Sequence, residues 1–153
     1  MKTNSTNEIR IKDMIKIIPK DKYYDKRVNN LINSIDKEVV MINNEIGAIA
    51  FINKIVFLKL VTWICNINHR RKGQASKALY NLKKRHRILF SKIQPNNNES
   101  YKFAMKNGFK ELFKIPKFFG SYTGTLIFWR KLNSFNKEKE GEWKKKRIQH
   151  IIA

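Results

Sequence analysis

Residues 54–79, KIVFLKLVTWICNINHRRKGQASKAL, place a strand pattern, a basic loop and a helix pattern in direct succession. The run 54–67 is long, β-branched and aromatic, which predicts a strand buried over most of its length in the middle of a sheet. After Gly73, apolar residues recur at the i, i+3, i+4, i+7 spacing of a helix that rests one face on a sheet. The run 87–93, RILFSKI, has the pattern of a returning strand, so this stretch predicts a right-handed strand–helix–strand crossover.

Further elements are predicted on both sides of this crossover. The pattern from Ile9 indicates an opening strand that Pro19 ends, and apolar residues at helical intervals predict a helix at 21–35. Residues 38–52 form a hairpin signal, because two apolar runs flank Asn43-Asn44 and Asn tolerates the positive φ of tight turns. The elements expected downstream are a helix at 100–107 that Gly108 stops, a strand at 109–115 that Pro116 closes, and a strand at 123–132. Helices and strands in this order predict an α+β fold with a mixed sheet.

The composition favours one basic domain with a packed core. The chain has 153 residues, 42% of them hydrophobic, which is enough to bury a sizeable core. Its 33 Lys and Arg against 12 Asp and Glu give a net charge of +21, which favours a polyanionic partner such as nucleic acid, a phosphorylated ligand or an acidic membrane face. Richness in Lys, Asn and Ile also fits AT-rich coding without selection for binding. We expect a domain at 1–132 and a basic, charge-rich tail at 133–153.

Several classes of protein are disfavoured. A single cysteine, Cys65, excludes an intrachain disulfide and a cysteine-cluster zinc site, and the three histidines lack metal-ligand spacing, so we expect no metal. No apolar run approaches the ~20 residues that a membrane-spanning helix needs. The N-terminus, MKTNSTNEIRIKD, lacks the apolar core of a signal peptide, so we predict a cytoplasmic protein. The oligomeric state stays open.

Two motifs carry a family resemblance. Arg70-Arg71-Lys72-Gly73-Gln74-Ala75 fits an R/Q-x-x-G-x-G/A signature, and NNNESYKFAMKNGF (96–109) fits an N-x-x-A/S…K-x-G-F block. In this order, with a hairpin upstream, residues 38–131 resemble the GCN5-related N-acetyltransferase (GNAT) family. The resemblance implies a mostly antiparallel twisted sheet flanked by helices, with splayed central strands. The second motif is most similar to the subgroup that acetylates protein N-termini.

The first motif has the chemistry of an anion site. A helix N-terminus offers unpaired N–H groups and a partial positive charge to an anion, and Gly73 permits close approach. The three cations before Gly73 would add charge-assisted contacts, although a solvated basic loop is the plain alternative. The resemblance implies that the anion is the pyrophosphate of acetyl-CoA. The implied cofactor-binding residues are Cys65, Ile67, Arg70, Arg71, Lys72, Gly73, Gln74, Ala75, Ser76 and Asn97.

Three of these residues have implied positions along the cofactor. Cys65 and Ile67 lie at the carboxyl end of the predicted central strand, where backbone amides of the family pair with the pantetheine arm. Asn97 matches an asparagine of the family near that arm, but it could equally cap the helix that follows.

Residues for acid–base catalysis are harder to find. Many family members carry a carboxylate on the central strand, yet 55–65 contains no Asp or Glu, and Ala104 stands where many have a Tyr acid. The catalytic candidates are therefore Ser100, which could hydrogen-bond the cofactor, and Tyr101, which could reach the leaving thiolate. The structural alternatives are that the Ser100 hydroxyl caps the helix and that the Tyr101 ring packs against the core. A buried role suits Cys65 better than that of a nucleophile, so direct transfer is expected.

The sequence thus predicts an acetyl-CoA-dependent N-acetyltransferase that acts on an amine, such as a protein N-terminus or lysine. Because the chain is basic, cationic acceptors such as polyamines and aminoglycosides rank lower. One alternative is a catalytically reduced GNAT-fold protein that binds nucleic acid or a ribonucleoprotein. Another is an acyltransferase that modifies nucleic acid. The tail, with Trp143 beside KKKR (144–147), could contact nucleic acid or a membrane interface, or simply be solvated.

Overall fold

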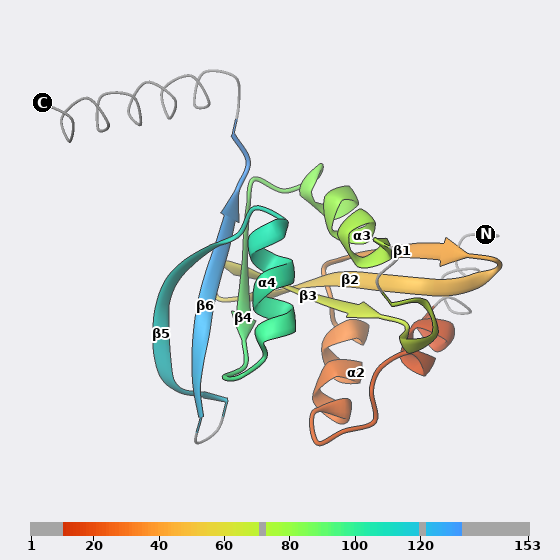
Figure 1. Ribbon diagram of the computed structural model, residues 1–153, viewed down its shortest axis with the longest axis horizontal. Helices are drawn as coiled ribbons and strands as arrows, with labels where there is room; N and C mark the ends of the chain where they lie inside the picture. Colours follow the sequence, from red (N-terminus) through yellow and green to blue (C-terminus); the bar gives the residue numbers. More distant parts are fainter. Residues whose placement is uncertain (1–10, 71–72, 120–121, 133–153) are drawn as a thin grey trace, which may run out of the picture.

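A six-stranded sheet forms the centre of the computed structural model, which describes residues 11–70, 73–119 and 122–132 (Figure 1). The strand order is β1-β2-β3-β4-β6-β5. The strands are β1 (Asp36–Ile42), β2 (Glu45–Ile55), β3 (Leu58–Cys65), β4 (Ile88–Ile93), β5 (Lys110–Phe119) and β6 (Tyr122–Arg130). The helices are α2 (Tyr24–Ile32), the 3-10 turn η1 (Ile67–His69), α3 (Gln74–Lys83) and α4 (Asn98–Lys106).

Neighbouring strands are antiparallel except for β3 and β4, which are parallel and joined by α3. The predicted α+β class, the hairpin, the crossover and the mostly antiparallel sheet are therefore confirmed. Figure 1 shows α2 on one face of the sheet and α3 on the other, with α4 against β4 and β6.

The two parallel strands diverge after a short contact. Within the described strands, β3 and β4 are in register only at Leu60↔Phe90, whereas β2 and β3 pair along the whole of β3. The buried Ser91 hydroxyl donates a hydrogen bond of 2.8 Å to the Val61 carbonyl oxygen, which gives a partner to a carbonyl beyond the last paired position. Figure 1 shows the two strands pointing in clearly different directions. The splayed central strands implied by the family resemblance are present.

The core lies on both faces of the sheet, which explains why β2 is apolar almost throughout. Ala50 and Ile52 pack on the face that α3 covers, with Leu79 among their partners. Ile49 and Phe51 pack on the opposite face, with Leu31 of α2. Successive side chains of a strand point to opposite faces, so a strand covered on both sides needs no polar alternation.

Three predicted boundaries are corrected. Residues 11–16 are helical, not part of a strand, because Met14 and Ile18 lie four residues apart and both bury one side against the sheet. The run 54–67 is not one strand, since Val56-Phe57 form a turn between β2 and β3. Pro116 does not close the strand at 109–115: it lies inside β5, an edge strand, where the missing N–H is tolerated.

None of the helices in the described ranges is long and apolar enough to cross a membrane. The predicted domain boundary at 132 stays a prediction, and the tail at 133–153 lies outside the described residues.

Candidate functional site

The N-terminus of α3 is open. Gly73 is its N-cap residue, with the left-handed φ of 76° that disfavours other residues, and a Cβ built there meets no atom within 4 Å. No acidic residue occupies the first turn of α3 to balance the partial charge of the helix. Among the described residues a side chain at Gly73 would therefore meet no neighbour, and an anion at this end of α3 stays a prediction. Arg71 and Lys72 lie outside the described residues.

The first turn of α3 rests on the β1–β2 hairpin through Gly47. β1 and β2 shift register between Val40 and Met41, which leaves a bulge at this glycine. A Cβ on Gly47 would lie 3.0 Å from Cγ of Gln74 and 3.0 Å from Cγ2 of Ile42. Gln74 thus has a packing role. Sequence reasoning missed Gly47, although an isolated glycine in a strand pattern indicates a bulge or a close approach.

Asn66 organises the loop that leads to α3. Its backbone N–H donates to the Gly47 carbonyl at 2.8 Å, and its side-chain Nδ2 donates to the Ile46 carbonyl at 2.8 Å. Its Oδ1 accepts from the Asn68 N–H at 3.1 Å, and its carbonyl accepts from the His69 N–H at 2.9 Å. These bonds tie η1 to the hairpin and so position Arg70, which follows η1. Asn66 was not among the predicted site residues.

The two residues expected on the carboxyl end of the central strand have different environments. Cys65 ends β3 and is half-buried, and its Sγ lies 3.7 Å from the Gly47 carbonyl oxygen. Burial, together with Glu99, raises the pKa of the Cys65 thiol against the opposing charge of Arg70, which disfavours a nucleophilic thiolate. Ile67 is not on the strand: it begins η1, and 72% of its surface is exposed. The implied strand position of Ile67 is therefore wrong.

Ser76 and Ala75 have clear structural environments on α3. Ala75 is buried against the sheet, so its small size suits packing. The Ser76 Oγ accepts a hydrogen bond of 3.2 Å from Nδ2 of Asn107, at the C-terminus of α4. The Lys83 ammonium donates to the carbonyl of the same Asn107. The K-N-G-F motif thus joins the C-terminus of α4 to both ends of α3.

The candidates on α4 are held by local bonds. Asn97 is the N-cap residue of α4, and its side-chain oxygen accepts from the Ser100 N–H at 3.2 Å, so the capping role is realised. The Tyr101 hydroxyl donates to the Glu111 carboxylate at 2.9 Å, which raises the pKa of Tyr101 and keeps the phenol protonated. Asn97, Ser100 and Tyr101 therefore share the first turn of one helix.

An open pocket of about 660 Å³ adjoins the end of β3. Its walls come from the N-terminal helical segment, the β1–β2 turn and η1. The lining includes three of the predicted cofactor residues, Cys65, Ile67 and Arg70, together with two carboxylates, Asp13 and Glu45.

Glu45, the first residue of β2, is paired. Its Oε2 lies 2.8 Å from Nε2 of the buried His69. Nδ1 of His69 is buried with no hydrogen-bond partner in the described part of the chain. The two residues are 24 positions apart, so no local pattern in the sequence could have joined them.

Lys92 is a further titratable group close to the splay. It lies on β4 between Ser91 and Ile93 and, by strand alternation, faces the α2 side of the sheet. Burial, helped by the nearby charge of Lys26, lowers the pKa of Lys92 to about 8.

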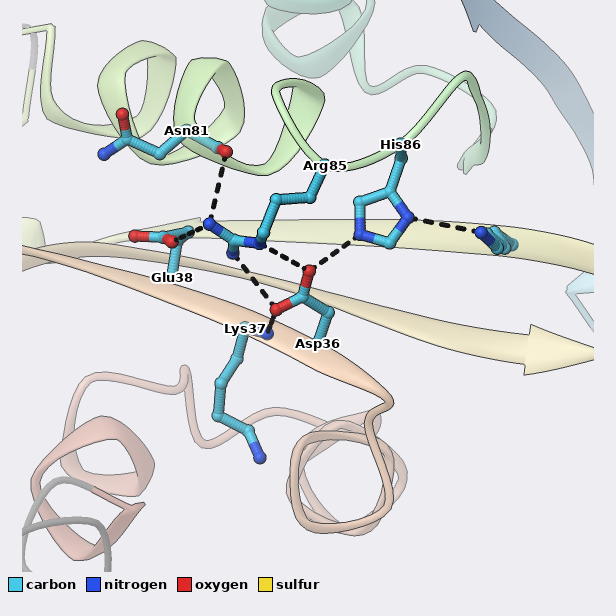
Figure 2. Close-up of polar contacts among 7 residues, drawn as sticks. Asp36, Lys37, Glu38, Asn81, Arg85 and His86 are labelled. Atoms are coloured by element: carbon cyan, nitrogen blue, oxygen red, sulfur yellow. Dashed lines mark hydrogen bonds and ion pairs between the residues drawn. The ribbon is translucent and has the colours of Figure 1, made fainter. Parts of the chain in front are cut away.

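A second polar cluster lies at the other end of α3 (Figure 2). Asp36 accepts from Nε and Nη2 of Arg85, both at 3.0 Å, and lies 2.7 Å from Nε2 of His86. Lys59 Nζ lies 3.3 Å from Nδ1 of His86, and Arg85 also pairs with Glu38 at 2.6 Å. Because an ammonium can only donate, Nδ1 of His86 accepts and Nε2–H donates to Asp36. The charged groups of this cluster pair with one another, so we interpret the cluster as a structural link between β1 and the segment that follows α3.

Within the described residues, no group of three or more His, Cys, Asp or Glu could hold a metal ion.

Sequence comparison finds no match, whereas comparison of structures finds proteins of similar fold. No protein-family model and no curated protein matches the chain. A GNAT-family acetyltransferase from Bacillus cereus ATCC 10987 has a TM-score of 0.64 at 16% identity, covering 80% of this chain and 92% of its own. The ribosomal-protein-S18-alanine N-acetyltransferase from Escherichia coli has a TM-score of 0.63 at 13% identity, with 81% and 90% covered.

A third match is shorter. An N-acetyltransferase from Staphylococcus aureus Mu50 has a TM-score of 0.52 at 20% identity over 60% of this chain, and the chain spans 65% of the length of that enzyme. At such identities the likeness is one of fold. The chain has the fold of the GNAT acetyltransferases, as its two motifs implied.

Proposed function

We propose that this protein is an N-acetyltransferase that uses acetyl-CoA as donor and transfers the acetyl group directly to an amine. The observation that carries the proposal is the open N-terminus of α3 at Gly73, beside two parallel strands that separate after one pair. A splayed strand edge offers unpaired amides to an extended arm, and the helix end offers N–H groups to its pyrophosphate. Several solved structures that match this fold hold acetyl-CoA or coenzyme A.

The cofactor would lie along residues of both motifs. Gly73 and the first turn of α3 would bind the phosphates, with charge from Arg70, Arg71 and Lys72. Backbone groups near Cys65 would pair with the pantetheine arm. Ile67 would contact it from η1 and not from the strand, and the remaining predicted residues Gln74, Ala75, Ser76 and Asn97 would support the site mainly through packing and capping.

The chemistry requires a neutral amine to attack the thioester carbonyl, after which the tetrahedral intermediate collapses to an amide and the thiol of CoA. β3 supplies no carboxylate base, so alignment of the two substrates would provide much of the rate, up to ~7–11 kcal/mol for near-ideal geometry. Tyr101, protonated and hydrogen-bonded to Glu111, is the proposed donor to the leaving thiolate. Ser100 is the proposed hydrogen-bond partner of the cofactor. No metal is part of this mechanism.

The acceptor would enter the pocket beside η1. Asp13 and Glu45 line this pocket together with Lys16 and Arg70, and the two carboxylates pair with Lys16 and His69, so the lining offers an acceptor both signs of charge. The similarity of the second motif to N-terminal acetyltransferases favours a protein N-terminus or a lysine. The E. coli enzyme of the same fold is named for acetylating the alanine of a ribosomal protein. The cytoplasmic location stays part of this proposal.

Calorimetric titration with acetyl-CoA tests the cofactor site. We expect the wild type to bind and Gly73→Glu to lose detectable binding, because a carboxylate would occupy the phosphate position. Gly73→Asn separates charge from backbone strain, since Asn tolerates a φ of 76° and a Cβ at Gly73 meets no atom of the described residues within 4 Å. Tyr80→Glu places the same charge on the exposed face of α3 and should keep full affinity. A folded wild type that does not bind acetyl-CoA would refute the proposal.

One surface favours a second candidate, a nucleic-acid-binding function. On the exposed face of α3, the Lys84 ammonium lies 4.8 Å above the ring of Tyr80, and Lys77 occupies the same face one turn earlier. A cationic stripe with an exposed aromatic is a form that single-stranded nucleic acid can stack on. Salt-dependent binding of an oligonucleotide without release of CoA would favour this candidate. Binding together with transfer to a base amine would favour a nucleic-acid-modifying acyltransferase.

A further inference from the structure

The turn between β2 and β3 presents an exposed apolar tip. Val56 and Phe57 form the two-residue connection, and 80% and 81% of their surfaces are exposed. Ile55, the last residue of β2, is also exposed. These three consecutive side chains project from the narrow end of a hairpin, so the apolar surface is convex and has no groove of its own.

The tip keeps its apolar residues at a conformational cost. Val56 has a φ of 58°, and Phe57 has no positive φ. This is the pattern of a turn that prefers glycine at its first central position. A β-branched residue in the left-handed region is a genuine outlier, and such strain is concentrated at functional positions. Val56 and Phe57 are too exposed for packing within the hairpin to offset this backbone strain, so a role of the two side chains in binding would explain why they are present.

Cations surround the tip. Exposed Lys54 stands directly opposite Lys59 on β3, whose ammonium lies 3.3 Å from Nδ1 of His86, so Lys54 is the cation of this pair that faces outward. Exposed Arg87 lies at the start of β4, next to the start of β3, and Arg130 pairs with Ile88 at the end of β6. The carboxylates on the neighbouring part of β1, Asp36 and Glu38, are both engaged by Arg85.

We propose that this end of the sheet docks on an anionic lipid bilayer surface, with Phe57 and Val56 entering the interface and the surrounding cations contacting the headgroups. An apolar tip rimmed by Lys and Arg matches the two attractions that a peripheral membrane protein uses. A two-residue turn is too small for a stable protein interface, which buries upward of about 1,000 Å². A bilayer needs no matching groove.

The topology leaves the opposite end of the protein accessible in this orientation. Gly73 and the pocket follow the carboxyl end of β3, whereas the tip lies at the amino end of β3. The inference does not depend on acetyl-CoA binding and is tested separately from it.

Sedimentation with vesicles tests the docking. The full chain is mixed with vesicles of phosphatidylcholine alone or of phosphatidylcholine with phosphatidylglycerol, at low and at raised salt. We expect the wild type to bind the anionic vesicles. Phe57→Ser should bind about tenfold or more weakly, because it loses the apolar contact of the phenylalanine with the bilayer. This loss should persist at raised salt, since salt does not screen an apolar contact. Phe113→Ser, which alters an exposed phenylalanine on β5, is the matched control and should bind like the wild type. Val56→Gly combined with Phe57→Ser retains the turn and guards against a folding artefact.

Each other outcome overturns the inference. Equal binding by the wild type and Phe57→Ser would show that net charge alone attracts the vesicles. A wild type that stays in the supernatant, or that binds neutral vesicles equally well, would show that no such surface exists. Self-association that Phe57→Ser abolishes would identify a second copy as the occupant, and oligonucleotide binding that depends on Lys54 but not on Phe57 would identify nucleic acid.

Discussion

The two tight hairpins of the sheet solve the same geometric problem in opposite ways. The β1–β2 turn uses Asn43 and Asn44, whose φ values of 50° and 64° suit a residue that tolerates the left-handed region. The β2–β3 turn uses Val56, a β-branched residue that gains nothing from its φ of 58°, followed by Phe57, whose φ is not positive. The first turn precedes Glu45 and Gly47, which support the candidate cofactor loop. Favourable turn chemistry thus lies where a loop must be held, and unfavourable chemistry lies where side chains face outward.

Moving the apolar pair into the first turn should give the largest effect. Replacing Asn43-Asn44 by Val-Phe would force two unsuitable residues to positive φ, which we expect to cost at least about 2 kcal/mol of unfolding free energy. Urea denaturation measures the change. Because Glu45 and Gly47 follow the turn directly, acetyl-CoA affinity measured by calorimetry should fall as well.

The matched control for this exchange is Asn43→Asp with Asn44→Gly, which keeps a preferred pair for the turn and should leave stability and affinity close to wild type. If Val-Phe were tolerated at the first turn without loss of stability, the contrast between the two hairpins would have no energetic basis.

Relieving the strain in the second turn should give a smaller effect of opposite sign. Val56→Gly allows the φ of 58° freely, and we expect a gain of about 1 kcal/mol in unfolding free energy after the extra entropy of the unfolded glycine is counted. Thermal or urea denaturation measures it. Ala at the same position keeps the strain and removes the bulk, so Val56→Ala should show little of the gain.

These two turns also show which features of the fold the sequence could predict. Asn43-Asn44 predicted a turn correctly because asparagine favours the positive φ that the turn adopts. Val56-Phe57 continue an apolar run, so the sequence carries no signal of the turn that they form. Gly73 was predicted because a local motif describes its surroundings. The crossover and the packed face of α3 followed from periodicity, which depends only on neighbours in sequence.

Contacts between distant residues could not be predicted in this way. The approach of Gln74 to Gly47, the Glu45–His69 pair and the Ser91 bond to Val61 each join segments that meet only after the sheet has formed. The 3-10 turn at Ile67 also depends on contacts between distant residues. Asn66 donates hydrogen bonds to the β1–β2 hairpin, and these bonds terminate β3 at Cys65. The local motif predicts an anion site, but long-range hydrogen bonds shape the loop where it is predicted.

The smallest expected effect concerns Lys83, a half-buried side chain that joins the C-terminal end of α3 to α4 and β6. The Lys83 ammonium lies 5.0 Å from the ring centre of Trp129, and burial lowers the pKa of Lys83 to about 8, from 10.5 in an unfolded chain. Between these two pH values the unfolded chain binds more protons than the folded one. The contribution of Lys83 to stability therefore rises as pH increases from about 8 toward 10.5, and it is lost as pH falls back through that window.

Urea denaturation of the wild type and Lys83→Met across this window isolates the effect. The difference in unfolding free energy should shift in favour of the wild type as the pH rises, because Met binds no proton in either state. Lys84→Met removes an exposed neighbour and corrects for the general relief of positive charge, so its difference from the wild type should be flat by comparison. A parallel pH dependence for both variants would mean that Lys83 titrates normally and that the C-terminal end of α3 is held without a half-buried charge.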